Sequence, residues 1–133
     1  MKVLSPVNGT LDVTARQIHR ETVSFPGTLI IGVGSARLYF SRSATVVNVI
    51  VGSSVVPVGA TIIFDLNKNG ITMFTTQASR PTIALGNTYD GLSVPDITTI
   101  IAGDYLTADI DQVGSTTAGA DAVLIVEYYH TTA

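Results

Sequence analysis

The sequence contains no cysteine and no tryptophan, and only 13% of its 133 residues are charged. Without cysteine, neither a disulfide framework nor a thiolate-ligated metal site can form. The charged fraction is about half that of an ordinary soluble domain, whereas hydrophobic residues make up 46% of the chain. A small domain with so few charges leaves apolar side chains on its surface, and such surfaces usually mark contacts with a partner. We therefore expect the chain to form an obligate oligomer.

Basic residues are also scarce, because seven Lys and Arg face ten Asp and Glu, which gives a net charge of −3 and a pI of about 5.0. Nucleic-acid-binding proteins neutralise phosphates with a basic face, so we expect no nucleic-acid partner. Met1 and Lys2 are not followed by the apolar segment of a secretory signal. Residues 43–64 carry no charge and could cross a bilayer by length, but Pro57, Gly59 and many β-branched residues favour two strands joined by a turn. We expect no membrane partner.

Valine, isoleucine and threonine account for more than a third of the chain, and their branched Cβ atoms favour strands. Residues 36–41 and 104–111 alternate between apolar and polar positions, which is typical of strands with one buried face. An Asn-Gly pair at positions 69 and 70 predicts a β-hairpin between two apolar runs. A long connection over residues 77–102 is normal in Greek-key and jelly-roll folds. The sequence predicts an all-β protein, a jelly-roll-like antiparallel β-sandwich of about eight strands.

The first 22 residues differ from the rest, because they contain three of the seven basic residues. We expect residues 1–22 to form an N-terminal arm and residues 23–133 to form one β-sandwich domain. Both a frayed terminus and an arm that docks on a neighbour fit this composition. Within the domain, Pro26 and Gly27 predict a break between two strands.

One polar segment partly matches a calcium-binding loop. Asp65, Asn67, Asn69 and Gly70 occupy the spacing of its first half, but Thr76 stands at the twelfth position, where a bidentate glutamate is needed. The same residues are favoured at a hairpin corner through their turn preferences. We interpret them as a turn.

Other candidate sites are equally incomplete. Asp109 and Asp111 share one face of a predicted strand and could bind a cation, but they also fit the solvated side of that strand, which is the interpretation we favour. His19 and His130 lie near the two ends of the chain, where no rigid frame for a Ser-His-Asp system is expected. We expect no catalytic residue, no bound metal, no cofactor and no enzymatic activity.

Several motifs together resemble a module of bacteriophage virion proteins. They are DLNKNG at 65–70, SRPTIALG at 79–86 and AGDYLTADIDQVGSTTAGAD at 102–121. The upstream segment GTLIIGVGSARLYFSRSATVVNVIV at 27–51 resembles the first half of the same module, so the resemblance spans about residues 28–129. It implies a compact jelly-roll sandwich that acts as a trimer, found in capsid decoration (cement) proteins and in the heads of tail fibres. No catalytic residues belong to the motif.

The resemblance leaves two roles open. A chain of this length has no room for a long fibre shaft, which favours a decoration protein: a homotrimer on the major capsid protein, on the capsid exterior of the virion, assembled in the host cytoplasm. In that role Arg16, His19 and Arg20 are candidate capsid contacts. The alternative is the receptor-binding head of a short tail fibre or spike, which would bind host glycan through loops near residues 86–96 and 114–120.

Overall fold

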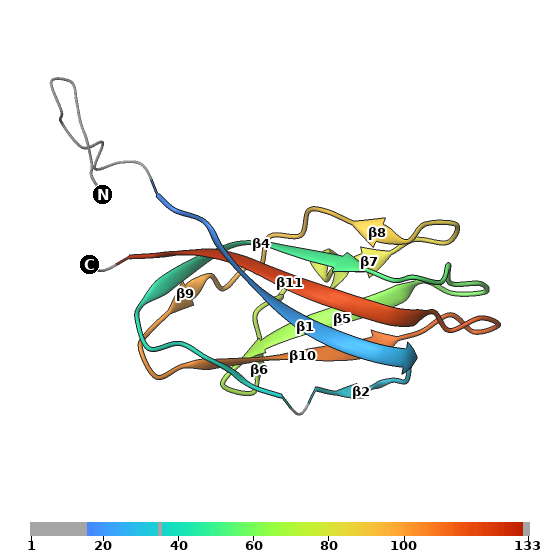
Figure 1. The fold of residues 1–133 in the computed structure, drawn as a ribbon, viewed down its shortest axis with the longest axis horizontal. Helices are drawn as coiled ribbons and strands as arrows, with labels where there is room; N and C mark the ends of the chain where they lie inside the picture. The colour runs from blue at the N-terminus through green and yellow to red at the C-terminus, as the bar shows by residue number, and fades with distance from the viewer. Residues whose placement is uncertain (1–15, 35, 132–133) are drawn as a thin grey trace, which may run out of the picture.

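The computed structural model describes residues 16–34 and 36–131 (Figure 1). In these residues the chain forms two antiparallel sheets and one 3-10 helix, which confirms the predicted all-β sandwich. The long strands are β1 (His19–Thr28), β4 (Ala44–Gly52), β5 (Ile62–Lys68), β10 (Tyr105–Gln112) and β11 (Ala120–His130). The other strands have two residues each: β2 (Gly32–Val33), β3 (Leu38–Tyr39), β6 (Ile71–Thr72), β7 (Thr82–Ile83), β8 (Tyr89–Asp90) and β9 (Thr99–Ile100). The 3-10 helix η1 (Gln77–Ser79) lies between β6 and β7.

The strand order places two pairs of edges on opposite sides of the sandwich. The first sheet has the order β1-β11-β4-β8, with β9 also paired to β4. The second has the order β2-β10-β5-β6, with β3 paired to β10 and β7 paired to β5. Figure 1 shows β7 and β8 along one margin of the molecule and β2 along the opposite margin, while β1 crosses the front and ends near β2. This order is compatible with a jelly roll.

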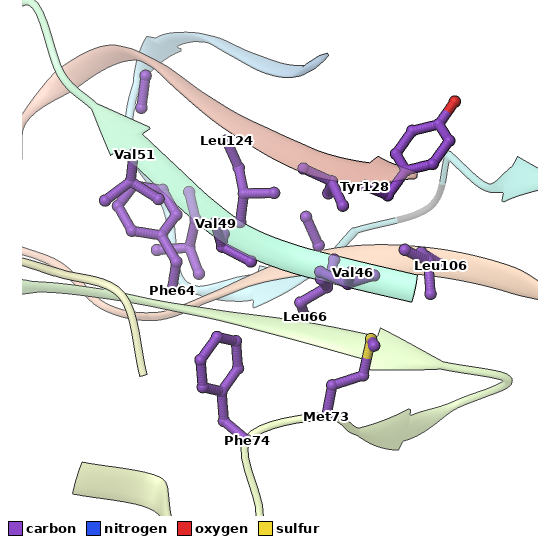
Figure 2. Close-up of a cluster of buried hydrophobic side chains, with 14 of the residues drawn as sticks. Val46, Val49, Val51, Phe64, Leu66, Met73, Phe74, Leu106, Leu124 and Tyr128 are labelled. Carbon is purple, nitrogen blue, oxygen red and sulfur yellow. The ribbon is translucent and has the colours of Figure 1, made fainter. Parts of the chain in front are cut away.

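The core lies between the two sheets and follows from the alternation of each long strand. Successive side chains of a strand point to opposite faces, so every second residue of β5, β10 and β11 faces the core (Figure 2). The same alternation in β4 is interrupted once, by a register shift between residues 46 and 49. Fully buried examples from these strands are Ile62, Phe64, Leu66, Leu106, Ala108, Leu124, Val126, Val49 and Val51. The outward residues of β11 are also mostly apolar, which fits its position between β1 and β4.

The hairpin at the Asn-Gly pair forms as predicted, but its second strand is short. Asn69 and Gly70 both have positive φ angles, 51° and 85°, as the turn of a two-residue hairpin requires. The return strand ends at Thr72, although the apolar run continues, because Met73 and Phe74 are both completely buried. Two consecutive residues of a flat strand cannot both enter the same core, so the chain leaves the sheet there.

The first long strand begins earlier than the expected domain boundary. β1 starts at His19, and its residues 19–22 pair with residues 125–128 of β11, so the expected boundary at Val23 falls inside the strand. Residues 1–15 of the expected arm lie outside the described residues. The strand also continues through Pro26 and Gly27 with a register shift, where a break was predicted. An edge strand tolerates proline at a position whose N–H would point to solvent, because the pairing with β11 does not need that group.

The long uncharged segment forms two strands, as predicted. Residues 43–64 contain β4 and the first half of β5, separated by the turn around Ser53 and Gly59. Among the described residues, no helix has the length and hydropathy to cross a membrane.

Candidate interaction surface

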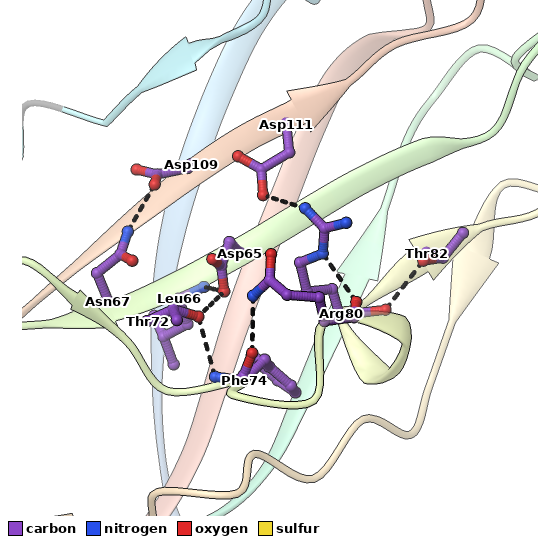
Figure 3. Close-up of polar contacts among 10 residues, drawn as sticks. Asp65, Leu66, Asn67, Thr72, Phe74, Arg80, Thr82, Asp109 and Asp111 are labelled. Carbon is purple, nitrogen blue, oxygen red and sulfur yellow. Dashed lines mark hydrogen bonds and ion pairs between the residues drawn. The ribbon is translucent and has the colours of Figure 1, made fainter.

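The outer face of the second sheet gathers three carboxylates, all of which have partners within the chain (Figure 3). Asp65 and Asp109 lie directly opposite each other on β5 and β10. Asn67 donates from Nδ2 to Asp109 Oδ2 at 2.6 Å. Arg80 Nη1 lies 2.7 Å from Asp111 Oδ2, in an ion pair whose side chains are both less than a third exposed. This pairing offsets the repulsion between neighbouring carboxylates.

Asp65 is the most deeply buried of the three carboxylates, with 6% of its surface exposed. Its Oδ1 accepts hydrogen bonds from the Leu66 amide and the Thr72 hydroxyl, each at 2.8 Å. Burial raises the pKa of Asp65 above its ordinary value, although these two hydrogen bonds oppose the shift. The nearby negative charges of Asp111 and Asp109 raise the pKa further.

The predicted solvated position of Asp109 and Asp111 is only partly correct. Both are half-buried, and Asp109 Oδ1 also accepts a hydrogen bond from the Gly34 amide at 3.2 Å. Among residues 16–34 and 36–131, no group of three or more acidic, histidine or cysteine side chains is arranged to hold a metal ion. The two carboxylates are instead tied to neighbouring segments of the chain.

The partial calcium-loop motif forms a hairpin corner, as interpreted from the sequence. Asn69 Nδ2 donates to Asp104 Oδ1 at 2.9 Å, and Asn69 Oδ1 accepts from the Tyr105 amide at 3.1 Å. A further hydrogen bond from the Ile101 amide to Asp104 is the main reason that the pKa of Asp104 is lowered. The motif residues therefore fix the connection between two strand ends.

Two of the three predicted capsid contacts lie on the outer face of the first sheet. The guanidinium carbon of Arg16 lies 4.6 Å from the centre of the Tyr129 ring. Arg20 Nε forms an ion pair with Glu127 Oε2 at 2.7 Å, and the Arg20 side chain is 61% exposed. Because Arg20 and Glu127 are register partners, both point away from the core.

The third predicted contact, His19, lies on the opposite face of β1. It is the register partner of Tyr128, which is buried, and the two rings stack at 5.5 Å. The His19 ring also lies 4.9 Å from the ring of His130. The structure thus brings Arg16 and Arg20 to one face and places His19 on the other, so the three do not form a single surface.

Sequence reasoning missed an apolar patch beside β1 and β2. Ile30, Ile31 and Val33 are 78%, 60% and 80% exposed; we call them the β1/β2 edge patch. They border a groove of about 390 Å³ whose lining includes Val23 and Phe25. The groove lies where the edges of the two sheets meet. The signal was present in the sequence, because residues 22–36 contain no charged side chain.

A second apolar patch lies on the opposite side of the sandwich. Leu85, Tyr89, Leu92 and Val94 are 54%, 62%, 72% and 53% exposed; we call them the β8 edge patch. Asp90 is the only charged residue in residues 81–95, and its carboxylate accepts hydrogen bonds from the amides of residues 82 and 92 and from the hydroxyl of residue 93. Large exposed apolar side chains grouped in this way usually mark an interaction surface.

Comparison with known proteins gave one distant structural likeness. No family model matches the chain, and no curated protein matches it. A chain of the cyanophage Pam1 capsid asymmetric unit superposes with a TM-score of 0.49 at 15% identity, covering 98% of this chain and 94% of that chain. At this level the likeness assigns neither a fold nor a role to this protein.

Proposed function

We propose that this chain is a bacteriophage structural protein: a capsid decoration (cement) protein that binds the outer shell as a homotrimer and stabilises it. The major capsid protein would be its partner on the exterior of the virion, after assembly in the host cytoplasm. The observation that carries the proposal is the pair of exposed apolar edge patches on a sandwich whose motifs resemble phage virion modules. Exposed apolar surfaces of this kind often mark a contact with another protein.

The polar residues of the motifs support a structural role. Asp65, Asn67, Arg80, Asp109 and Asp111 bind one another or nearby backbone groups. Their hydrogen bonds hold the outer face of the second sheet to the segment that crosses it. Neither enzymatic activity nor a cofactor is part of the proposal.

Arg16 and Arg20 are the residues through which we expect the shell to be contacted. Both lie on the outer face of the first sheet. A trimer would present three copies of Arg16 and Arg20 together. Simultaneous engagement multiplies a modest affinity at each site, provided that the spacing of the shell matches that of the trimer.

The direct test is binding to shells that lack the protein. Purified protein is titrated onto such shells, and bound protein is separated by sedimentation. We expect saturable binding and a higher temperature of shell opening in the decorated particles. Absence of saturable binding would contradict the decoration role.

The contact residues are tested with a matched pair of variants. Arg16→Ala removes one positive charge from the outer face of the first sheet, whereas Lys68→Ala removes one from the end of β5 in the second sheet. We expect Arg16→Ala to weaken shell binding several-fold and Lys68→Ala to leave it unchanged. Equal weakening by both would mean that net charge, and not this surface, controls binding.

A receptor-binding head is the second candidate, favoured by one feature of the loops. The Ser53 amide donates to the Thr88 carbonyl and the Ser54 amide donates to the Ala120 carbonyl, both at 2.9 Å, so the loops near 86–96 and 114–120 meet at one end. Tyr89 is exposed beside them, and an exposed aromatic ring can stack on a sugar.

A glycan array separates this candidate from the decoration role. If the protein is a receptor-binding head, it should bind host glycans, Tyr89→Ala should abolish that binding, and Tyr39→Ala, which alters another exposed tyrosine, should not. Saturable shell binding with no glycan binding would exclude this candidate.

A further inference from the structure

Two arginine side chains on the outer face of the first sheet are held by alternate residues of β11. The guanidinium carbon of Arg16 lies 4.6 Å from the centre of the Tyr129 ring, and Arg20 Nε lies 2.7 Å from Glu127 Oε2. Glu127 and Tyr129 are two residues apart on one strand, so their side chains share a face and their Cα atoms lie about 7 Å apart. β11 therefore holds two guanidinium groups on the same face of the sheet.

Both contacts use only part of the binding capacity of a guanidinium group, which has five N–H donors. The Tyr129 ring attracts Arg16 through its π-electrons and supplies no acceptor oxygen. The two oxygens of the Glu127 carboxylate pair with two donors of Arg20 even in a bidentate geometry. Arg16 is exposed and the Arg20 side chain is 61% exposed, so each group can also bind a carboxylate of another molecule.

A further hydrogen bond fixes the carboxylate that holds Arg20. Asn48 of β4 is the register partner of Glu127 and donates from Nδ2 to Glu127 Oε1 at 3.1 Å. Asn48 Oδ1 in turn accepts from the Ser93 amide at 2.9 Å. The Glu127 side chain is only 14% exposed. Because its anchor is fixed in this way, Arg20 loses less side-chain freedom when it binds a partner.

The local charge of this surface is opposite in sign to that of the whole chain. The chain carries a net charge of −3, but here the two guanidinium groups of Arg16 and Arg20 face the single carboxylate of Glu127. Of the other carboxylates on β1 and β11, Glu21 points to the opposite face of β1, and Asp121 lies near the opposite end of β11. The complementary partner is therefore an acidic one.

We propose that Arg16 and Arg20 bind two carboxylates that are two residues apart in an extended acidic segment of the shell. Side chains at such positions of an extended chain share a face and lie about 7 Å apart, which matches the spacing of Glu127 and Tyr129 on β11. Each guanidinium can bind one carboxylate with two parallel N–H donors. Glu127 and Tyr129 are then positioning residues. The inference deepens the proposed function and rests on it for the shell as partner.

The first test uses peptides and needs no shells. A capped Thr-Asp-Thr-Asp-Thr peptide is titrated into the full chain, and the Nε–Hε NMR signals of the arginines are followed. We expect saturable shifts for Arg16 and Arg20 and none for Arg80, which is paired on the second sheet. A Thr-Asp-Asp-Thr-Thr peptide, whose carboxylates point to opposite faces when extended, should bind several-fold more weakly. Equal binding of the two peptides, or equal shifts with inorganic phosphate at the same concentration, would overturn the proposal.

The positioning role is tested with variants that keep the net charge. Tyr129→Leu removes the ring beneath Arg16 and should weaken peptide binding and shell binding several-fold, whereas the conservative Tyr129→Phe keeps the ring and should retain both. Arg20→Lys keeps the charge but loses the two parallel donors, so it should also weaken both. Thermal unfolding of each variant checks that the fold is intact. Identical binding by the Leu and Phe variants, or full binding by Arg20→Lys, would contradict the proposed geometry.

The two measurements let this inference and the decoration role fail separately. If the peptide binds to Arg16 and Arg20 as expected but the wild type shows no saturable binding to shells, the acidic-segment site stands and the decoration role fails. If shells bind the wild type, Tyr129→Leu and Arg20→Lys equally well, the decoration role stands and this inference fails.

Discussion

The outer face of the second sheet and the two edge patches differ in how their side chains meet solvent. On the sheet face, three carboxylates are half-buried or buried, and each has a partner within the chain. At the edges, apolar side chains stand more than half exposed, and none of residues 16–34 and 36–131 covers them. The side chains of the first region are satisfied within the chain, whereas we propose that another molecule covers those of the second.

The residues that carry the sequence resemblance are not distributed equally between these two regions. The motif residues Asp65, Asn67, Arg80, Asp109 and Asp111 belong to the self-contained region. A motif made of such residues specifies a scaffold, because each side chain serves a contact inside the molecule. The same scaffold fits both of the roles proposed above, so we expect the edges and loops to distinguish them.

We expect the largest loss of folding stability from removal of the Arg80 side chain. Arg80→Ala removes the ion pair to Asp111 and the hydrogen bond from Nε to the Gln77 carbonyl, and it leaves a carboxylate unpaired beside Asp65 and Asp109. Breaking a largely buried pair from one side should reduce the free energy of unfolding by about 2–3 kcal/mol. Denaturant titration measures this. Adding Asp111→Asn should recover part of the loss, and an unchanged unfolding midpoint in the single variant would contradict the prediction.

Asp109 is the residue that connects the two regions. Its carboxylate accepts from Asn67 on the sheet face and from the Gly34 amide just beyond β2. Asp109→Ala leaves both donors without this acceptor, so we expect a loss of about 1–2 kcal/mol in unfolding free energy. It should also weaken assembly, because Gly34 follows directly after the β1/β2 edge patch. A variant that loses stability but assembles normally would show that the two regions are independent.

The titration of Asp65 should make the stability of the folded protein depend on pH. Because its pKa is raised in the folded protein, folding takes up a proton, and stability falls as pH rises from the ordinary value of 3.8 through the raised pKa. Asp96 and Asp104 act in the opposite sense, since hydrogen bonds from backbone amides lower their pKa values and their contribution is lost as pH falls.

Asp65→Asn isolates this dependence, because the amide keeps an oxygen acceptor for Thr72 and Leu66 and carries no charge. We expect the variant to gain stability relative to the wild type as pH rises from 3 to 7. Thermal unfolding of both proteins across that range measures the difference. A difference that does not change with pH would show that burial leaves the titration of Asp65 unaffected.

Local sequence patterns predict the scaffold well, because it depends on neighbours along the chain. Alternation identified β10, and the turn preference of Asn69 and Gly70 identified the hairpin. Local sequence patterns did not predict the features that depend on contacts between segments far apart in the sequence. The two-residue strands form only because a longer strand lies beside them, and the start of β1 is hidden by His19 and Glu21 at inward positions.

The edge patches are the least predictable part for the same physical reason. From the sequence alone, the apolar run that contains Ile30, Ile31 and Val33 would be assigned to a buried strand. Hydrophobic periodicity does not show whether a strand lies in the middle or at the edge of its sheet. Their exposure depends on the strand order, which places β2 at the edge of its sheet. Equally, the position of Arg20 on the face opposite to His19 follows from the register of β1 on β11, and composition does not fix a register.

We expect the smallest loss of folding stability from a substitution in the β8 edge patch. This substitution gives the clearest contrast with the outer face of the second sheet. Leu92 is 72% exposed, so Leu92→Ser removes little contact within its own subunit, and the unfolding free energy of the isolated subunit should change by less than about 0.5 kcal/mol. Assembly into the proposed homotrimer should nevertheless weaken, because Leu92 is the most exposed side chain of the β8 edge patch, which we propose to be covered by another protein. Unfolding is measured at dilutions where the wild type is monomeric, and assembly is measured by sedimentation at high concentration. A large loss of subunit stability would show that Leu92 makes contacts within its own subunit that matter for folding. The difference between the outer face of the second sheet and the edge patches would then not hold at Leu92.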